Sequence, residues 1–197
     1  MTTRPLDAFP DFPVRRALDV RLVVLDVDGV LTDAGVYVGA DADGRPVEMK
    51  RFDIQDGLGV KLLQQAGVEV AVVSGRYSAA TEVRARELGI QECHQDNGAQ
   101  KVQAIRGILD RLDLGWENVA MVADDLPDLA VIRRVGFPVA VANAQPLVKR
   151  EVAWVTSAPG GRGAVREFAT ALLTARGDWE AVVEAYTRAR DGESHGE

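Results

Sequence analysis

The feature that most restricts the fold is a series of short apolar segments that alternate with longer segments of helical periodicity. Residues 21–26, 68–73, 119–122 and 138–141 are rich in valine and leucine, and 152–155 is a weaker fifth segment. Short apolar runs of this kind indicate strands that are buried on both faces. Strands that alternate with helices form βαβ units around a mainly parallel sheet. The sequence therefore predicts an α/β fold with a parallel central sheet.

The segments between these strands carry apolar residues at helical spacing, and several of them end at a glycine, which is a common helix end. We expect helices over 57–66, 78–88, 100–112 and 126–135, and one or two helices over 164–190.

One interval breaks the alternation. Residues 34–53 contain two short alternating runs around the Asp-Gly turn at 41–44, which predicts a β-hairpin. The hairpin would be inserted directly after the first strand, at the carboxyl edge of the sheet. Ligands of open α/β sheets bind at that edge, so the hairpin is expected to lie beside a binding site.

Length and charge restrict the remaining possibilities. A chain of 197 residues suits one α/β domain, and we expect an N-terminal arm over 1–20, the main α/β domain over 21–176, and a C-terminal helix with a charged tail over 177–197. The net charge of −7 disfavours non-specific binding of nucleic acid. The sequence has no apolar run typical of a signal peptide or a membrane span, which predicts a cytoplasmic protein without membrane partners.

The cysteine and the two histidines are not expected to carry chemistry. Cys93 is the only cysteine and cannot form an internal disulfide, so a buried apolar role is favoured. His94 and His195 lack the spacing of a metal site and are interpreted as incidental.

Two aspartates end the first predicted strand. Asp26 and Asp28 can face the same way because side chains alternate along a strand, and Gly29 lets the backbone turn sharply beside a ligand. Like charges this close repel each other unless a cation or a proton lies between them. A surface turn of two solvated aspartates is the alternative, and the apolar run before them disfavours it. The pair predicts a site that holds a metal ion, a shared proton, or both.

Three further polar groups lie at predicted strand ends or helix starts. Ser74 and the N–H groups after it could donate to a phosphoryl oxygen, although capping of the next helix is the stronger interpretation of this serine alone. Lys101 opens a helix, where a cation gains nothing from the helix dipole, and this slightly favours an anionic partner. Asp124 and Asp125 end a buried strand and Asp128 follows, which supplies the carboxylates that Mg²⁺ prefers.

In this order, the polar groups resemble the four motifs of the haloacid dehalogenase superfamily. The resemblance spans about residues 20–185, and longer segments of it are similar to the family of 3-deoxy-D-manno-octulosonate 8-phosphate phosphatases. These segments are Asp26–Asp33, Phe52–Gly57, Ser74–Arg76 and Gly160–Glu167. The family implies a Rossmann-like three-layer sandwich in which the small hairpin serves as a flap in place of a cap domain.

The resemblance implies a phosphomonoester hydrolase. Asp26 would be the nucleophile that forms an aspartyl phosphate, and Asp28 would be the general acid and then the general base. The family also implies a bound Mg²⁺ ion whose ligands are Asp26, Asp124 and the backbone carbonyl of Asp28. Asp125 and Asp128 would support these ligands. Phosphoryl transfer depends mainly on positioning and charge neutralisation, which these residues can provide.

The remaining roles implied by the family concern the substrate and the assembly. The phosphoryl group would be held by Ser74, Gly75 and Lys101. The candidates for recognition of a small sugar acid are Arg76, Arg84 and Arg162, although a solvated helix face explains Arg84 equally well. The family implies a homotetramer in which the flaps form a barrel, a neighbouring subunit completes the site, and the product enters lipopolysaccharide biosynthesis.

Two alternatives remain open at this point. The substrate could be a nine-carbon, sialic-acid-like 9-phosphate, although Arg76 after Ser74 and Gly75 favours the eight-carbon sugar. The chain could also be a non-catalytic oligomeric relative. That alternative depends on Ala123, where the family usually has glycine, because an added methyl group could crowd the phosphate or restrict the backbone.

Overall fold

The structure is a computed structural model that describes residues 8–191. Its centre is a six-stranded sheet of order β5-β4-β1-β6-β7-β8, and all of its neighbouring strands run parallel. The strands are β1 (Leu22–Leu25), β4 (Glu69–Ser74), β5 (Glu92–Gln95), β6 (Val119–Ala123), β7 (Phe137–Ala140) and β8 (Trp154–Val155). The predicted parallel α/β fold is confirmed. The sequence analysis missed β5, whose residues Glu-Cys-His-Gln form only a half-buried edge strand.

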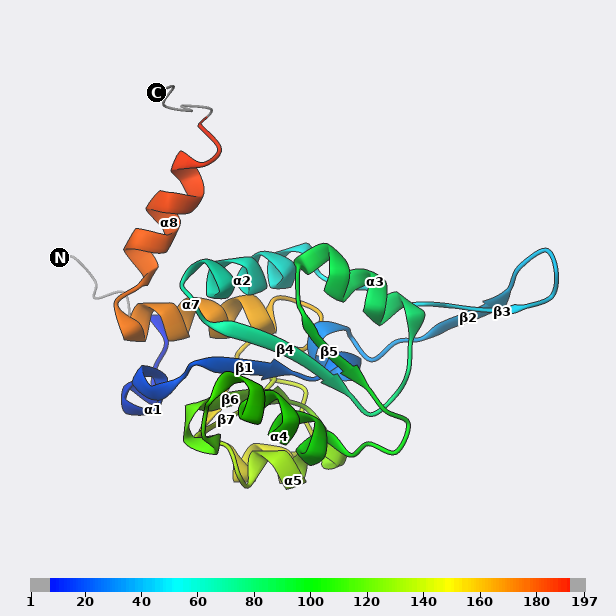
Figure 1. Ribbon diagram of the computed structural model, residues 1–197, viewed down its shortest axis with the longest axis horizontal. Helices are drawn as coiled ribbons and strands as arrows, with labels where there is room; N and C mark the ends of the chain where they lie inside the picture. The colour runs from blue at the N-terminus through cyan, green and yellow to red at the C-terminus, as the bar shows by residue number, and fades with distance from the viewer. Residues whose placement is uncertain (1–7, 192–197) are drawn as a thin grey trace.

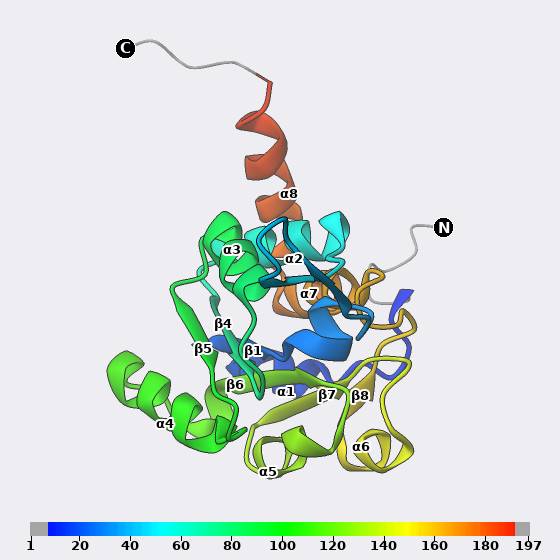
Figure 2. The same ribbon diagram turned by 90° about the vertical axis from the view of Figure 1, so that its right-hand side faces the viewer.

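Helices cover both faces of the sheet and complete a three-layer sandwich. In Figure 2, α2, α3 and α7 lie on one face and α4, α5 and α6 on the other. The helices are α1 (Val14–Asp19), α2 (Ile54–Gln65), α3 (Ala79–Leu88), α4 (Lys101–Leu112), α5 (Leu129–Ile132), α6 (Pro146–Glu151), α7 (Ala164–Arg176) and α8 (Trp179–Arg188).

Three helices differ from the sequence prediction. Helix α2 begins three residues earlier than expected because Asp53 caps it, accepting a hydrogen bond from the Gln55 N–H at 2.7 Å. Helix α5 is shorter than expected because Pro127 lies in a separate 3₁₀ turn, η4 (Leu126–Asp128). The short helix α6 was not predicted. The segment 164–190 forms two helices, α7 and α8, with Gly177 between them in the left-handed region.

The predicted hairpin is present after the first strand. Strands β2 (Tyr37–Ala40) and β3 (Pro46–Met49) pair antiparallel, and the turn between them is closed by Asp41, whose Oδ1 accepts the N–H groups of Asp43 and Arg45 at 2.9 Å each. Figure 1 shows this flap extending away from the body of the domain. Most of its residues are therefore exposed on both sides.

The described part of the N-terminal segment packs on the domain. Phe12 is buried, and its ring makes edge contacts with Phe137 at 5.4 Å and Trp154 at 4.9 Å between centroids. Cys93 is half-buried in β5 and not fully buried as expected. His94 Nε2 lies 2.7 Å from Glu92, whereas His195 lies outside the described residues. Within 8–191, none of the helices has the length and apolar character needed to cross a bilayer.

Candidate active site

The strand order places two of the predicted acids next to each other. The chain passes from β1 to β4 and β5 on one side of the sheet and then returns to β6 on the other side of β1. Such a switch point opens a crevice at the carboxyl ends of the strands. Asp26 follows β1 and Asp124 follows β6, and these strands are paired. Carboxylate oxygens of Asp26, Asp124 and Asp128 lie within 4.8 Å of one another.

Lys101 supplies the positive charge of this cluster. Its side chain at the start of α4 is buried, and its Nζ lies 2.5 Å from Asp26 Oδ1 and 2.6 Å from Asp128 Oδ1. Burial opposes the charge of the amine, but Asp26 and Asp128 outweigh burial and raise the pKa of Lys101. The lysine therefore carries a full charge at neutral pH. The anionic partner expected for this helix-opening lysine is a pair of carboxylates.

One lysine does not neutralise three acids. Burial, followed by repulsion from Asp128, raises the pKa of Asp26 to about 6 despite the contact with Lys101. Burial and repulsion from Asp26, Asp128 and Asp125 raise the pKa of Asp124 to about 8. The two carboxylates therefore resist ionisation in the absence of another cation. A small divalent ion with oxygen ligands fits this donor set.

The turn after β1 brings its backbone against this cluster. Gly29 has a φ of 98°, and a Cβ at this position would lie 2.1 Å from Asp124 Oδ2. Only glycine satisfies both the left-handed backbone and the close approach. This explains why the first aspartate pair is followed by glycine.

Asp28 follows β1 like Asp26, but its carboxylate faces the flap. Its Oδ1 accepts a hydrogen bond from Lys50 Nζ at 2.7 Å, and its Oδ2 lies 3.6 Å from Arg76 Nε. Lys50 comes from the end of the flap, and its side chain is fully buried. The carboxylate of Asp28 is therefore separate from the acidic cluster and held by two cations.

Glu48 on β3 links the flap to the loop after β4. It accepts hydrogen bonds from Arg76 Nη1 at 2.6 Å and from the Ser78 hydroxyl at 2.7 Å. The hydrogen bond from Arg76, followed by that from Ser78, lowers the pKa of Glu48. Within the described residues, the buried Arg76 Nη2 has no hydrogen-bond partner. The sequence analysis missed Glu48 and Lys50; their spacing of two on a predicted strand, which places both on one face, was the available signal.

A cavity of about 330 Å³ collects most of the predicted site residues. Its lining consists of Asp26, Asp28, Ala34, Ser74, Gly75, Arg76, Ala99, Lys101, Asp124, Asp125, Pro127 and Asp128. Ala123, which departs from the family pattern, ends β6 and does not line this cavity. The resemblance and the strand-end argument therefore selected residues that the fold brings together.

Ser74 does not cap a helix, contrary to the interpretation favoured from this serine alone. It ends β4, and its hydroxyl donates to the Arg76 carbonyl at 2.9 Å, while α3 begins later, after Ser78. Two of the predicted substrate residues lie outside the cavity. Arg84 donates to the Asp53 carbonyl at 3.0 Å, and Arg162 lies 3.7 Å from Asp33.

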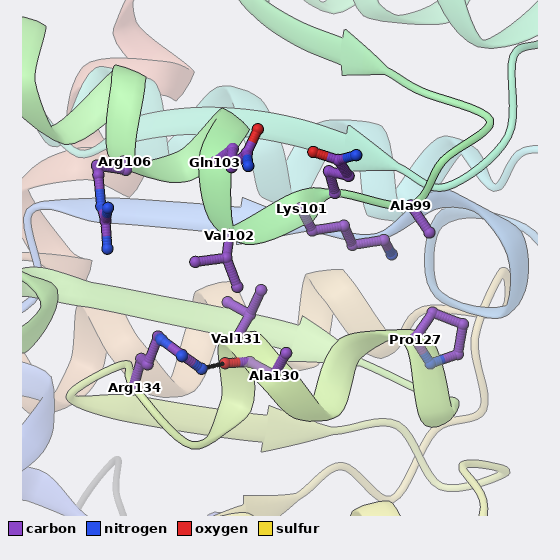
Figure 3. Close-up of a pocket in the computed structure, with 10 residues that line it drawn as sticks. Ala99, Lys101, Val102, Gln103, Arg106, Pro127, Ala130, Val131 and Arg134 are labelled. Atoms are coloured by element: carbon purple, nitrogen blue, oxygen red, sulfur yellow. Dashed lines mark hydrogen bonds between the residues drawn. The ribbon is translucent and has the colours of Figure 1, made fainter.

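A second cavity of about 560 Å³ lies between α4 and α5 and shares Ala99, Lys101 and Pro127 with the first. In Figure 3, Arg106 and Arg134 lie at one end of this cavity, and the Lys101 amine points toward the other end. None of its lining residues is acidic. It therefore offers no carboxylate to a hard cation, whereas the smaller cavity offers several.

Comparison with known proteins identifies relatives over most of the chain. A family model of haloacid dehalogenase-like hydrolases matches residues 95–166. The chain is 41% identical over 164 residues to the 3-deoxy-D-manno-octulosonate 8-phosphate phosphatase KdsC of Escherichia coli K12, covering 83% of the chain and 85% of that protein. It is 39% identical over 166 residues to the KdsC protein of Yersinia pestis, covering 84% and 86%.

Solved structures with the same fold carry the same names. The phosphatase from Yersinia pestis matches with a TM-score of 0.79 and 38% identity, covering 87% of this chain and 89% of that one. The 3-deoxy-D-manno-octulosonate 8-phosphate phosphatase from Moraxella catarrhalis, in complex with magnesium ion, phosphate ion and KDO, matches with a TM-score of 0.80 and 34% identity, covering 88% and 97%.

Proposed function

The chain belongs to the family of 3-deoxy-D-manno-octulosonate 8-phosphate phosphatases, which are haloacid dehalogenase-like hydrolases, and we propose that it hydrolyses this sugar phosphate with the aid of Mg²⁺. The products would be the free sugar acid and inorganic phosphate. The observation that carries the proposal is the buried cluster of Asp26, Asp124, Asp128 and Lys101 at the switch point of the sheet.

The acidic cluster fits the magnesium ion. The raised pKa values of Asp26 and Asp124 support this fit, because Lys101 alone does not balance the charge of these buried carboxylates. We propose that their oxygens and the backbone carbonyl of Asp28 hold the ion, and that Asp125 and Asp128 support this arrangement. Asp128 is already paired with Lys101, which favours a supporting role. Bound Mg²⁺ would neutralise the site and polarise a phosphoryl oxygen.

Asp26 is the proposed nucleophile. One of its oxygens forms a bond to phosphorus as the bond from phosphorus to the sugar oxygen breaks, which gives an aspartyl phosphate and the sugar alcohol. Lys101, Ser74 and the N–H of Gly75 line the same cavity and would hold the phosphoryl oxygens. Water then attacks the phosphorus of the aspartyl phosphate, which releases phosphate and restores Asp26.

Asp28 is the proposed acid and base of these two steps. In the first, its carboxyl proton passes to the sugar oxygen that leaves phosphorus; in the second, its carboxylate takes a proton from the attacking water. Its position supports this assignment, because it lines the cavity without joining the acidic cluster. Lys50 and Arg76 contact its two oxygens, which would hold the carboxyl group in one orientation.

Arg76 is the proposed contact for the sugar-acid carboxylate. Its Nη2, which has no hydrogen-bond partner among residues 8–191, and its position in the cavity support this role. Arg84 and Arg162 lie outside the cavity of one chain and would act only in an assembly. Such an assembly, proposed as a homotetramer, is supported by apolar side chains exposed on the flap, which are Val36, Tyr37, Val38, Val47 and Met49. A cytoplasmic location and a place in lipopolysaccharide biosynthesis complete the proposal.

The test compares phosphate release from three esters: the octulosonate 8-phosphate, a nine-carbon sialic-acid-like 9-phosphate and an aryl phosphate. We expect the eight-carbon substrate to be turned over most efficiently, with activity lost in excess chelator and restored by Mg²⁺. Asp26→Asn should remove turnover of all three esters, whereas Asp41→Asn, the same change in the exposed flap turn, should not. Efficient use of the nine-carbon ester alone would replace the proposed substrate. Absence of any turnover would favour a non-catalytic role.

A further inference from the structure

The glycine-rich segment Gly160–Gly163 lies directly on the turn that follows the nucleophile. The Gly161 N–H donates to the Val30 carbonyl at 2.8 Å, and a Cβ at Gly160 would lie 1.7 Å from the Gly29 carbonyl oxygen. No atom can be inserted between the two backbones. The position of the segment therefore fixes the position of the turn. Because Gly29 of this turn lies against the Asp124 carboxylate, the segment also restricts Asp124.

A buried carboxylate holds one end of this segment. Asp56 in the first turn of α2 is 1% exposed; its Oδ2 accepts the Gly163 N–H at 3.2 Å and its Oδ1 accepts the Arg166 N–H at 3.0 Å. These N–H groups belong to the start of α7, where Gly163 has no side chain that could cap the helix. Helices α2 and α7 lie side by side in both views (Figures 1 and 2), so Asp56 provides a cap from a neighbouring helix.

Glu167 holds the other end. Its two oxygens accept the N–H groups of Ser157 and Ala158 at 2.8 Å each. Between the two ends, Arg51 at the flap root donates to the Gly161 carbonyl at 2.6 Å. Two carboxylates and one guanidinium thus hold a short segment that contains three glycines and would otherwise have many conformations.

We propose that Asp56 is a positioning residue for the phosphatase reaction, which holds the segment Gly160–Gly163 against the catalytic turn and so keeps that turn in its productive geometry. This inference rests on the proposed function for its kinetic consequence. Its structural consequence, that loss of the Asp56 carboxylate loosens the contact between Gly161 and Val30, is independent of any activity.

A purely structural role makes a different prediction. If Asp56 only capped α7, its removal would lower the melting temperature and leave the folded enzyme with its normal kcat. If Asp56 positions the turn, kcat of the fully folded enzyme falls for every phosphate ester while KM changes little. The turn carries reacting groups, and displacement of about 1 Å can reduce a rate by about a hundredfold.

The experiment uses the full chain with Mg²⁺ and three variants: Asp56→Asn, Asp56→Ala and the control Asp41→Asn. Asp41 also accepts two backbone N–H groups, but in the exposed flap turn. Kinetics with the octulosonate phosphate and an aryl phosphate are measured well below each melting temperature, and amide exchange is followed at Gly161 and Gly163. We expect kcat to fall about tenfold or more in Asp56→Ala and less in Asp56→Asn, which retains one acceptor oxygen. Exchange at Gly161 should accelerate in both, and the control should match wild type.

Normal kcat on both esters in folded Asp56 variants would overturn the inference, and so would unchanged exchange at Gly161. If Asp56→Ala does not fold, Asp56→Asn decides. If neither folds, Glu167→Ala decides, since it releases the opposite end and should lower kcat in the same way. If wild type hydrolyses neither ester, the proposed function fails, and the exchange measurement still tests the contact that Asp56 is inferred to maintain.

Discussion

Replacement of the nucleophile should stabilise the protein when no metal is bound. Asp26 has a pKa of about 6 in the folded chain against an ordinary value of 3.8. The folded state therefore binds more protons than the unfolded state between these values, and stability must fall as the pH rises through that window. Asp26→Asn cannot ionise, so it escapes this loss while its amide oxygen can still accept a hydrogen bond from Lys101.

The size of the effect follows from the shift. A difference of about 2.2 pKa units corresponds to about 3 kcal/mol at 1.36 kcal/mol per unit. We expect wild type and Asp26→Asn to differ least near pH 4. From there to about pH 8, the variant should gain about 3 kcal/mol relative to wild type. For a domain of this size, that gain corresponds to a melting temperature higher by roughly 6–12 °C.

Urea denaturation in excess chelator measures this difference, and the three tryptophans of the chain report unfolding. Asp41→Asn makes the same side-chain change outside the cluster and serves as the control. Addition of Mg²⁺ to a thousand times its dissociation constant should reverse the order, because the bound ion then stabilises wild type by about 4.1 kcal/mol and the variant much less. A variant that is less stable than wild type by a constant amount at every pH would refute the charge argument.

Three further changes test other parts of the site. Lys101→Met should lower the free energy of unfolding of the metal-free protein by about 3–5 kcal/mol at neutral pH, measured by urea denaturation, because two buried carboxylates lose their cation. Gly29→Ala should weaken Mg²⁺ binding by about tenfold or more in calorimetry, because the added Cβ would displace the Asp124 carboxylate; unchanged affinity would show that the close approach is not required. Glu48→Gln should accelerate amide exchange in β3, since the flap would lose its charged contact with Arg76; equal exchange in variant and wild type would contradict the role of this contact in holding the flap.

The acidic cluster could be predicted from residues at strand ends, because their convergence depends only on the topology of the sheet. In a parallel sheet, residues that follow neighbouring strands must meet at one edge. Asp26 and Asp124 were found in this way and by resemblance, and Lys101 by its position at a helix start and by resemblance; the three do converge. Strand β5 escaped prediction because an edge strand needs no continuous apolar run, and its Glu-Cys-His-Gln sequence has none.

The contacts between the flap and the residues of the cavity could not be predicted from the sequence pattern. Lys50 meets Asp28, and Glu48 meets Arg76, only because the base of the flap lies beside the cavity, and a hairpin sequence does not specify its angle to the domain. Ser74 was misjudged for a related reason. Serine at a strand end is a common cap, and only the position of α3 shows that another serine precedes that helix.

The distribution of charge connects these observations. The chain carries a net charge of −7 yet is proposed to bind a substrate with a phosphate and a carboxylate. Its fold resolves this conflict by placing Lys101 inside the acidic cluster, and Lys50 and Arg76 against Asp28, which lines the same cavity as the candidate metal ligands. The deficit of positive charge that remains at Asp26 and Asp124 is the part that a divalent ion would supply. Affinity for Mg²⁺, low stability of the metal-free site and catalysis at Asp26 would then share a single electrostatic origin.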